Sequence, residues 1–312
     1  MSESILQTAP AWVRLAARLI RWMPAGRYRA IERLCRRPPK QFRMRMPRAL
    51  GGQWFWCDLR DSIAREVCFT GRYEPQETAV VRAVLKSGMT FVDVGANWGY
   101  FTLLAAYLVG ANGRILSLEP DPRLFRILQA NVAMNQLRQV QALQLAAGAV
   151  SGWLTLAGFD ETHGNFGLSR VVQDEADHSN LFRVPAQPLD HVMAEAGLEV
   201  VDLLKMDIEG AEGFALLGMR EALSHRRVRR LLLELHPHQL VEHGRTAAEI
   251  IQQLRECGYV GWRIDHSSQG NRRAAYHRHT SLREILRLLD PSRGLDPWPH
   301  LMWVSPETEL PW

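Results

Sequence analysis

The pattern of apolar and polar positions changes near residue 75, and the two parts of the chain predict different structures. From residue 75 onward, short apolar runs alternate with amphipathic stretches, which is typical of parallel strands in a sheet covered by helices on both faces. We expect seven strands, at residues 90–94, 114–119, 140–146, 201–207, 229–235, 258–264 and 300–304. The pattern therefore predicts a Rossmann-like α/β fold with a mostly parallel seven-stranded sheet.

The N-terminal part predicts two basic helices and an extension over residues 1–70, in front of a main domain over residues 71–312. Helical periodicity over residues 11–23 sets Arg14, Arg18 and Arg21 mainly opposite an apolar stripe of Trp12, Leu15, Ala16, Leu19, Ile20 and Met23. A second basic helix is expected over residues 27–37, and residues 40–70 are expected to form short strands or loops. The stripe over residues 11–37 can pack on the main domain or on a second subunit, or it can lie on a membrane or contact a lipid-linked substrate.

The stretch from residue 151 to residue 188 interrupts the alternation of strands and helices. It predicts an inserted hairpin followed by a long loop. Insertions of this kind often shape a substrate site.

The charge of the chain is unevenly distributed. The net charge of the 312 residues is +5, but residues 1–50 hold 12 Lys and Arg against 2 Asp and Glu, which leaves 26 against 31 for the remainder. The basic character therefore belongs to the N-terminal arm, and we expect no nucleic-acid partner for the acidic main domain.

Cysteine usage and the N-terminus indicate the compartment. The four cysteines form no C-x-x-C pair, which favours a reducing environment over a disulfide framework. Arg14, Arg18 and Arg21 interrupt the apolar region that a secretory signal would need. The uncharged run from Val94 to Gly113 contains four glycines, which favours a turn and a buried helix over a membrane span. We expect a cytoplasmic protein, with peripheral contact to the inner membrane surface as an alternative.

A glycine-rich turn follows the first predicted strand of the main domain. Asp93 lies next to the last residue of this strand, and Gly95 and Gly99 flank the turn into a helix. Asn97 stands where a third glycine is usual, and asparagine tolerates a left-handed backbone better than other non-glycine residues. The next strand ends at Glu119, where a carboxylate can accept hydrogen bonds from two ribose hydroxyls.

Two kinds of cofactor, NAD and S-adenosylmethionine, bind at a turn of this type. The spacing is not G-x-G-x-x-G, and Asp93 would repel a pyrophosphate but attract the cationic amino-acid tail of S-adenosylmethionine. Asp93 and Glu119 could also be a turn cap and a solvated strand end. Their occurrence together at two strand ends favours a site for S-adenosylmethionine.

The fourth and fifth predicted strands end in further ionisable residues. Alternation places Lys205, Asp207 and Glu209 on one face of the fourth strand, toward the cofactor turn, unless Lys205 only forms a structural ion pair there. Glu234 and His236 repeat the arrangement on the fifth strand, and His236 is a candidate general base. Asp207, Glu209, Glu234 and His236 could also hold Mg²⁺ or Mn²⁺, although we expect a site without metal.

With these segments in order, the chain resembles the FkbM family of S-adenosylmethionine-dependent methyltransferases. The similarity spans about residues 70–240 and its most specific element is the run from Lys205 to Glu212. The other matching segments are Gly71 to Pro75, Asp93 to Gly99, Glu119 to Asp121, Asn131 with Asn135, Leu189-Asp190, and Glu234 to Pro237. The insertion matches only loosely, around His163, Gly164 and Asn165.

The resemblance implies a class I methyltransferase fold and a methyl transfer to a hydroxyl of a sugar, glycolipid or polyketide-like acceptor. It implies a cofactor site formed by Tyr73, Glu74, Asp93, Gly95, Asn97, Gly99, Glu119 and Asp207. It implies a reaction centre at Lys205, Asp207 and Glu209, beside which His236 is our candidate base. Two other functions stay open, namely a nicotinamide-dependent oxidoreductase and an inactive scaffold that docks through its basic N-terminal arm.

Overall fold

A central sheet of eight strands organises the chain. The computed structural model describes residues 7–36, 41–158, 169–171, 180–276, 281–290 and 294–312. The strand order is β13-β12-β14-β11-β10-β3-β4-β5. The strands are β3 (Thr90–Val94), β4 (Arg114–Leu118), β5 (Val140–Leu143), β10 (Leu203–Met206), β11 (Arg230–Glu234), β12 (Val260–Ile264), β13 (Leu286–Leu288) and β14 (His300–Val304).

The seven predicted strands are all present in this sheet, and the predicted Rossmann-like fold is confirmed. Strands β11, β10, β3, β4 and β5 run parallel, whereas β14 is antiparallel to both β11 and β12. The short edge strand β13 was not predicted. The strand expected over residues 140–146 ends at Leu143, because Ala146–Ala147 (β6) pairs with a second sheet.

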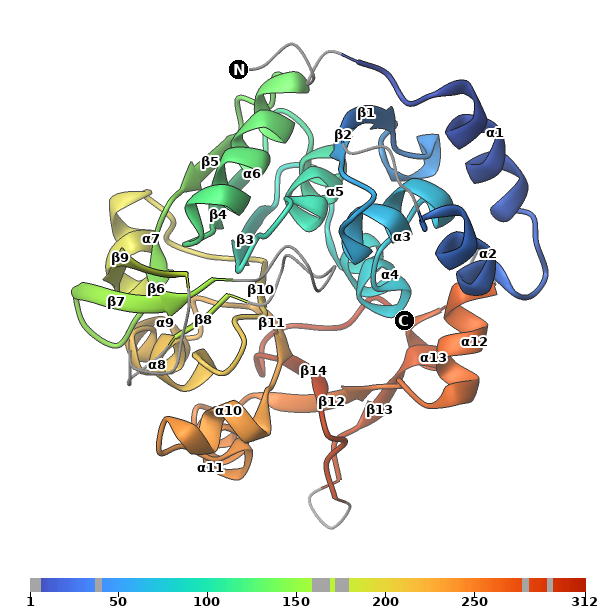
Figure 1. Cartoon of the computed structure of the whole chain (residues 1–312). Helices are drawn as coiled ribbons and strands as arrows, with labels where there is room; N and C mark the ends of the chain where they lie inside the picture. The colour runs from blue at the N-terminus through green and yellow to red at the C-terminus, as the bar shows by residue number, and fades with distance from the viewer. Residues whose placement is uncertain (1–6, 37–40, 159–168, 172–179, 277–280, 291–293) are drawn as a thin grey trace.

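Helices cover both faces of the sheet (Figure 1). Adjacent residues of a strand pack into different cores. Phe91 packs with the helices that precede β4 in the chain, and Val92 packs with those between β5 and β12. One face carries α4 (Pro75–Val84), α5 (Tyr100–Val109) and α6 (Pro122–Met134), and the other carries α7 (Leu189–Glu195), α8 (Glu212–Leu217), α9 (Arg220–Ser224), α10 (Pro237–Glu242) and α11 (Ala247–Glu256). Near the C-terminus, α12 (Ser268–Tyr276) and α13 (Leu282–Ile285) pack on α4.

The uncharged run Val94 to Gly113 forms the glycine turn and the buried helix α5, as predicted. Within the described parts of the chain, every helix is too short or too polar to cross a membrane.

The predicted insertion forms a separate small sheet. β7 (Gly152–Ala157) pairs antiparallel with β9 (Leu181–Gln187) and with the short β8 (Arg170–Val171), which confirms the hairpin. Figure 1 shows this sheet on the side of the molecule away from α1. The long loop predicted here, with His163, Gly164 and Asn165, lies outside the described residues.

The N-terminal helix buries only part of the predicted stripe, namely Ile20, with Ala16 and Met23 partly buried beside it. Helix α1 (Ala11–Ile20) packs on α3 (Ser62–Thr70) through Val13, Ala17 and Ile20, whereas Leu15 and Leu19 are exposed. Both rows are apolar, so only the position of α3 decides which row is covered, and the role of the exposed row stays a prediction. The second predicted helix is present as α2 (Arg27–Leu34).

Residues 41–70 contain more regular structure than expected. β1 (Phe42–Arg45) and β2 (Trp54–Cys57) form the expected short strands on either side of a single 3₁₀ turn (Arg48–Leu50). Helix α3 was not predicted, although Asp61 caps it by accepting a hydrogen bond of 2.9 Å from the Ala64 N–H. Its β-branched residues are poor helix formers, and burial of Ile63, Val67 and Phe69 stabilises it instead.

Two asparagines attach this N-terminal segment to the sheet domain. The side chain of Asn135 accepts from the N–H of Trp54 and donates to its carbonyl, each at 2.7 Å. Asn131, which is buried, accepts from the Trp56 N–H at 2.7 Å and donates to the Trp98 carbonyl at 2.8 Å. Asn131 therefore connects β2 to the glycine turn. The division at residue 70 stays a prediction.

Candidate functional site

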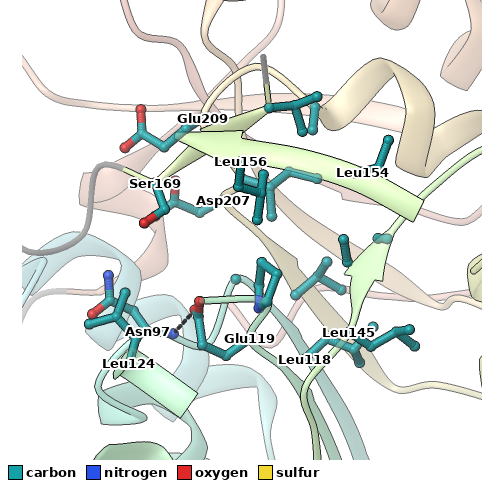
Figure 2. Close-up of a pocket in the computed structure, with 18 of the residues that line it drawn as sticks. Asn97, Leu118, Glu119, Leu124, Leu145, Leu154, Leu156, Ser169, Asp207 and Glu209 are labelled. Atoms are coloured by element: carbon teal, nitrogen blue, oxygen red, sulfur yellow. Dashed lines mark hydrogen bonds between the residues drawn. The ribbon is translucent and has the colours of Figure 1, made fainter. Parts of the chain in front are cut away.

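A cavity of about 840 Å³ opens at the carboxyl ends of β3, β4 and β10. The strand order reverses between β3 and β10, which is where open α/β sheets bind their ligands. Figure 2 shows Glu119 on one side of the cavity and Leu154 and Leu156 of β7 on the other. Its lining is Ile63, Tyr73, Val94, Gly95, Asn97, Leu118, Glu119, Pro120, Leu124, Leu145, Ala146, Ala147, Leu154, Leu156, Ser169, Val171, Asp207, Ile208, Glu209 and Ala211.

The glycine turn is held by contacts that exclude larger side chains. Gly95 has φ +82°, and a Cβ there would clash with the carbonyl oxygen of Asp207. Asn97 has φ +51°, as its substitution for glycine predicted, and its Oδ1 accepts a 2.7 Å hydrogen bond from the Trp98 N–H. Gly99 lies outside the cavity lining, and a Cβ there would come within 2.6 Å of the Leu128 side chain, so Gly99 allows α6 to pack closely.

Glu119 lies in the cavity wall beside this turn. Its Oε2 accepts a 2.7 Å hydrogen bond from the Asn97 N–H, drawn in Figure 2, and its Oε1 accepts one of 2.8 Å from the Asp121 N–H. Burial raises the pKa of Glu119 to about 8, although both backbone amides stabilise its ionised form. Each carboxylate oxygen keeps a second lone pair with which to accept a hydroxyl from a ligand.

Asp93 is fully buried beneath the turn and is not part of the cavity lining. Its Oδ2 accepts a 2.7 Å hydrogen bond from the Thr102 hydroxyl, which lies 2.8 Å from the Ser117 hydroxyl. Burial raises the pKa of Asp93, and the charge of Lys205 opposes that shift. The predicted cofactor contact of Asp93 stays a prediction.

Lys205 and Asp207 form an ion pair at the end of β10. The Lys205 Nζ lies 3.2 Å from Asp207 Oδ2 and 4.9 Å from the centre of the Phe101 ring. Burial would lower the pKa of Lys205, but Asp207, Glu74, Asp93 and Glu234 raise it above its ordinary value. Burial would raise the pKa of Asp207, but Lys205 and His236 lower it. Asp207 reaches the cavity, while Lys205 stays behind it.

The predicted alternation of faces is wrong beyond Met206. The strand ends there, and both Ile208 and Glu209 line the cavity. Glu209 has φ +51° and Gly210 has φ +98°, so the chain turns away from the sheet at this point. A left-handed backbone is uncommon for glutamate, and here it lies at the point where Glu209 enters the cavity wall.

His236 lies behind Glu209, between three carboxylates. Its Nδ1 is 2.8 Å from Oε1 of the buried Glu212, and its Nε2 is 3.4 Å from Glu209 Oε2 and 3.7 Å from Glu234 Oε1. Burial would lower the pKa of His236, but the hydrogen bond and charge of Glu212 raise it to about 9. Burial raises the pKa of Glu209 to about 7. At neutral pH His236 is therefore protonated, and Glu209 can take up a proton.

Tyr73 and Glu74 approach the centre from the start of α4. Tyr73 lines the cavity, whereas Glu74 does not and has the left-handed φ of +42°. Burial raises the pKa of Glu74 to about 7. Oxygens of Glu74, Asp207 and Glu234 lie within 4.8 Å of one another, as do ligand atoms of Asp207, Glu209 and His236. Both clusters could hold a cation by composition, and Asp207 belongs to both.

A neighbouring cluster was missed by sequence reasoning. The buried Glu77 lies 2.7 Å from His266 Nε2 and 2.9 Å from His300 Nδ1, and the two rings stack with centroids 3.9 Å apart. His300 Nε2 is 3.4 Å from Glu234, which connects this cluster to the site. Glu77 and the two histidines are far apart in the sequence, so no local motif predicts that they form a cluster.

Sequence reasoning also missed the apolar wall of the cavity. Leu145 precedes β6, Leu154 and Leu156 come from β7, and Ser169 donates a 2.7 Å hydrogen bond to Asp121. The sequence signal was the insertion itself, but the pairing of β7 with β9 decides which of its side chains face the cavity.

Comparisons with known proteins identify methyltransferases as relatives of this chain. The family model described as the methyltransferase FkbM domain matches residues 93–260, just over half of the chain. The methyltransferase sdnD of Sordaria araneosa is 32% identical over 168 residues, which cover 45% of this chain and 63% of that protein. The 2-O-methyltransferase NoeI of Sinorhizobium fredii is 25% identical over 159 residues, covering 47% of this chain and 64% of that protein.

The chain spans between a tenth and less than two thirds of the curated relatives it matches. Among solved structures, the methyltransferase FkbM from Methylobacillus flagellatus is similar over 77% of this chain and 52% of that one. The TM-score of this match is 0.45 and the sequence identity is 16%.

Proposed function

The chain belongs to the FkbM methyltransferase domain family, and on that premise we propose that it transfers a methyl group from S-adenosylmethionine to a hydroxyl of an acceptor molecule. The proposal rests chiefly on one juxtaposition. A single cavity brings together a strand-end carboxylate, Glu119, and an acidic centre, Asp207 and Glu209, which come from opposite sides of the strand-order reversal.

The residues of the cavity fit S-adenosylmethionine. Leu118, Leu145, Leu154 and Leu156 provide apolar surface for the adenine, and Glu119 has lone pairs free for the ribose hydroxyls. Asp207, ionised beside Lys205, provides negative charge for the cationic methionine end. When bound, S-adenosylmethionine supplies a reactive methyl group on a positively charged sulfur.

Asp207 and Glu209 orient the acceptor, and Glu209 takes its proton. Glu209 lines the cavity and its raised pKa of about 7 suits a base that works near neutral pH. His236 was our sequence candidate for this base, but it is 4% exposed, lies outside the cavity lining and is protonated at neutral pH. We assign His236 the role of positioning Glu209, with Glu212 fixing the imidazole through Nδ1.

The acceptor class follows from the relatives and from the chemistry of the centre. NoeI is named a 2-O-methyltransferase, and a carboxylate that accepts a proton suits a hydroxyl acceptor. We therefore propose a sugar, glycolipid or polyketide-like hydroxyl as the methylated group. The nicotinamide alternative is disfavoured because the turn from Gly95 to Gly99 lacks the G-x-G-x-x-G spacing, and because the carboxylate of Asp207 lines the cavity beside Gly95, where a pyrophosphate would need positive or amide groups.

Two experiments in sequence test the proposal. Calorimetric titration with S-adenosylmethionine should show micromolar binding that NADH does not reproduce, and that weakens in the Asp93→Ala variant. Incubation with labelled S-adenosylmethionine and a panel of glycans and glycolipids should then yield an O-methylated product by mass spectrometry. Tighter binding of NADH than of S-adenosylmethionine would refute the proposal at the first step, and methylation confined to amines would refute the acceptor class.

A further inference from the structure

Five arginines line a groove on the N-terminal segment, away from the catalytic cavity. The groove has a volume of about 960 Å³ and is formed by α1, β1, β2 and the residues before α1. It is lined by Thr8, Ala9, Arg14, Ala17, Arg18, Arg21, Trp22, Arg43, Met44, Arg45 and Trp54. Figure 1 shows α1 and α2 at the outer edge of the molecule.

The arginines of the groove are not neutralised within the described part of the chain. Arg21 and Arg45 donate to the backbone carbonyls of Cys68 and Gly52, at 3.0 Å and 2.8 Å. Arg43 and Arg45 lie over the Trp54 ring, with Cζ to centroid distances of 4.6 Å and 4.2 Å. None of the ion pairs among described residues involves any of the five. Guanidinium groups that converge without carboxylates form a binding surface for an anion such as phosphate.

An apolar row runs along α1 and the turn after it, beside this groove. Trp12, Leu15, Leu19 and Trp22 are 44%, 57%, 61% and 70% exposed, respectively. Their spacing of three and four residues places them on one face of the helix, opposite the buried row Val13, Ala17 and Ile20. Arg14, Arg18 and Arg21 lie between the two rows. Large apolar side chains exposed in a continuous row mark a contact surface.

We propose that the arginine groove and the apolar row together bind the surface of a membrane that contains anionic phospholipids. The arginines hold lipid phosphates, and Leu15, Leu19 and Trp22 enter the boundary between headgroups and acyl chains. Tryptophan is enriched at that boundary, and two of the four exposed residues are tryptophan.

Two other binding partners would each match only one part of this surface, either the arginines or the apolar row. A nucleic acid would satisfy the arginines but would leave the leucines in water. A second copy of the chain, in a two-fold contact, would cover the apolar row but would bring five arginines against five arginines. An anionic membrane presents lipid phosphates next to apolar acyl chains, so it matches both the arginines and the apolar row.

A flotation assay with the full chain tests the proposal. Vesicles of phosphatidylcholine alone are compared with vesicles that also contain phosphatidylglycerol, at low and high salt. We expect binding only to the anionic vesicles and a decrease at high salt, because exposed charges are screened. Arg14→Gln/Arg18→Gln should weaken binding about tenfold or more, and Leu15→Ser/Leu19→Ser should weaken it about tenfold.

Matched variants elsewhere on the surface provide the controls. Arg138→Gln/Arg227→Gln removes two exposed arginines, and Val150→Ser/Val241→Ser removes two exposed apolar side chains, from regions outside the groove. Both should bind vesicles as the unmodified chain does. Equal binding to both vesicle types, or equal losses in the matched controls, would overturn the proposal. So would a duplex oligonucleotide that displaces the vesicles, or a dimer in sedimentation that dissociates in the leucine variant.

Discussion

Nε2 of His236 lies 3.4 Å from Oε2 of Glu209, and of these two residues Glu209 alone reaches the cavity. Glu212 holds the imidazole through Nδ1, so that Nε2 points to the carboxylate of Glu209. That carboxylate in turn lines the cavity. A positive imidazolium at this distance stabilises the ionised form of Glu209, and this coupling determines how the reaction depends on pH.

The pH profile should identify the base. If Glu209 takes the proton, kcat/KM rises with pH through an apparent pKa near 7 and is level above it. His236→Gln removes a positive neighbour, so the pKa of Glu209 goes up and the rise moves to higher pH. Glu221→Gln, at an exposed position, should leave the rise where it is. A rise near pH 9 that disappears in His236→Gln would instead make His236 the base.

Asp207 should matter more than His236 for the chemical step. Asp207→Asn removes the closest partner of the buried Lys205 and the charge at the cavity wall, whereas His236→Gln leaves both in place. In single-turnover assays we expect His236→Gln to cost about 10² to 10⁴ in rate and Asp207→Asn to cost more. An equal or smaller loss for Asp207→Asn would contradict this arrangement of the centre.

Glu119 should determine the affinity for S-adenosylmethionine. Above the Glu119 pKa of about 8, Glu119→Gln keeps an acceptor beside the Asn97 amide but loses the charge that strengthens hydrogen bonds from hydroxyls. We expect Kd to rise about 10-fold to 100-fold, since hydrogen bonds to charged groups contribute roughly 1.5–3 kcal/mol. Calorimetry at about pH 9, where Glu119 is ionised, measures the change, and the exposed variant Glu221→Gln serves as control. An unchanged Kd would place the ribose elsewhere.

The Glu77 cluster should contribute to stability in a pH-dependent way. Burial would lower the pKa of His300, but Glu77 raises it from 6.5 to about 10, so this contribution is complete below pH 6.5 and is lost as pH rises through about 10. The two histidines lower the pKa of Glu77 despite its burial, so its contribution is lost as pH falls below about 4.5.

Glu77→Gln should therefore lower the free energy of unfolding at pH 7 by about 3 kcal/mol, as for a broken buried ion pair. Urea titration measures this change. Glu195→Gln disrupts the exposed pair of His191 and Glu195, 3.2 Å apart, and should cost about 0.5 kcal/mol or less. Equal effects of the two substitutions, or a Glu77 effect that persists above pH 10, would contradict the interpretation.

Removal of divalent metal should leave the activity unchanged. The Lys205 ammonium already lies 3.2 Å from Asp207, and a protonated His236 has no lone pair for a metal. We expect kcat/KM after dialysis against a chelator to stay within about twofold. Activity lost to the chelator, restored by Mn²⁺ and accompanied by a rise in Tm would show that a metal binds among these acidic and histidine side chains after all.

The sequence by itself determined the architecture and the strand ends. Strand and helix periods are local properties of the chain, so the seven strands, the glycine turn with Asn97 in a left-handed conformation and the inserted hairpin could all be predicted. The carboxyl ends of parallel strands meet where the strand order reverses. For this reason Glu119, Asp207 and Glu209 line one cavity, as expected from their positions in the sequence.

The tertiary structure alone decided which of these groups meet the substrate space and which face of α1 is exposed. His236 and Glu209 alternate with apolar neighbours in the same way, but the left-handed turn at Glu209 moves its side chain in front of the imidazole. Helix α1 carries two apolar rows, and contact with α3 buries only one of them. Glu77, His266 and His300 come into contact only in the folded structure. Periodicity specifies that a face is apolar or charged, whereas the neighbour that covers it comes from distant parts of the chain.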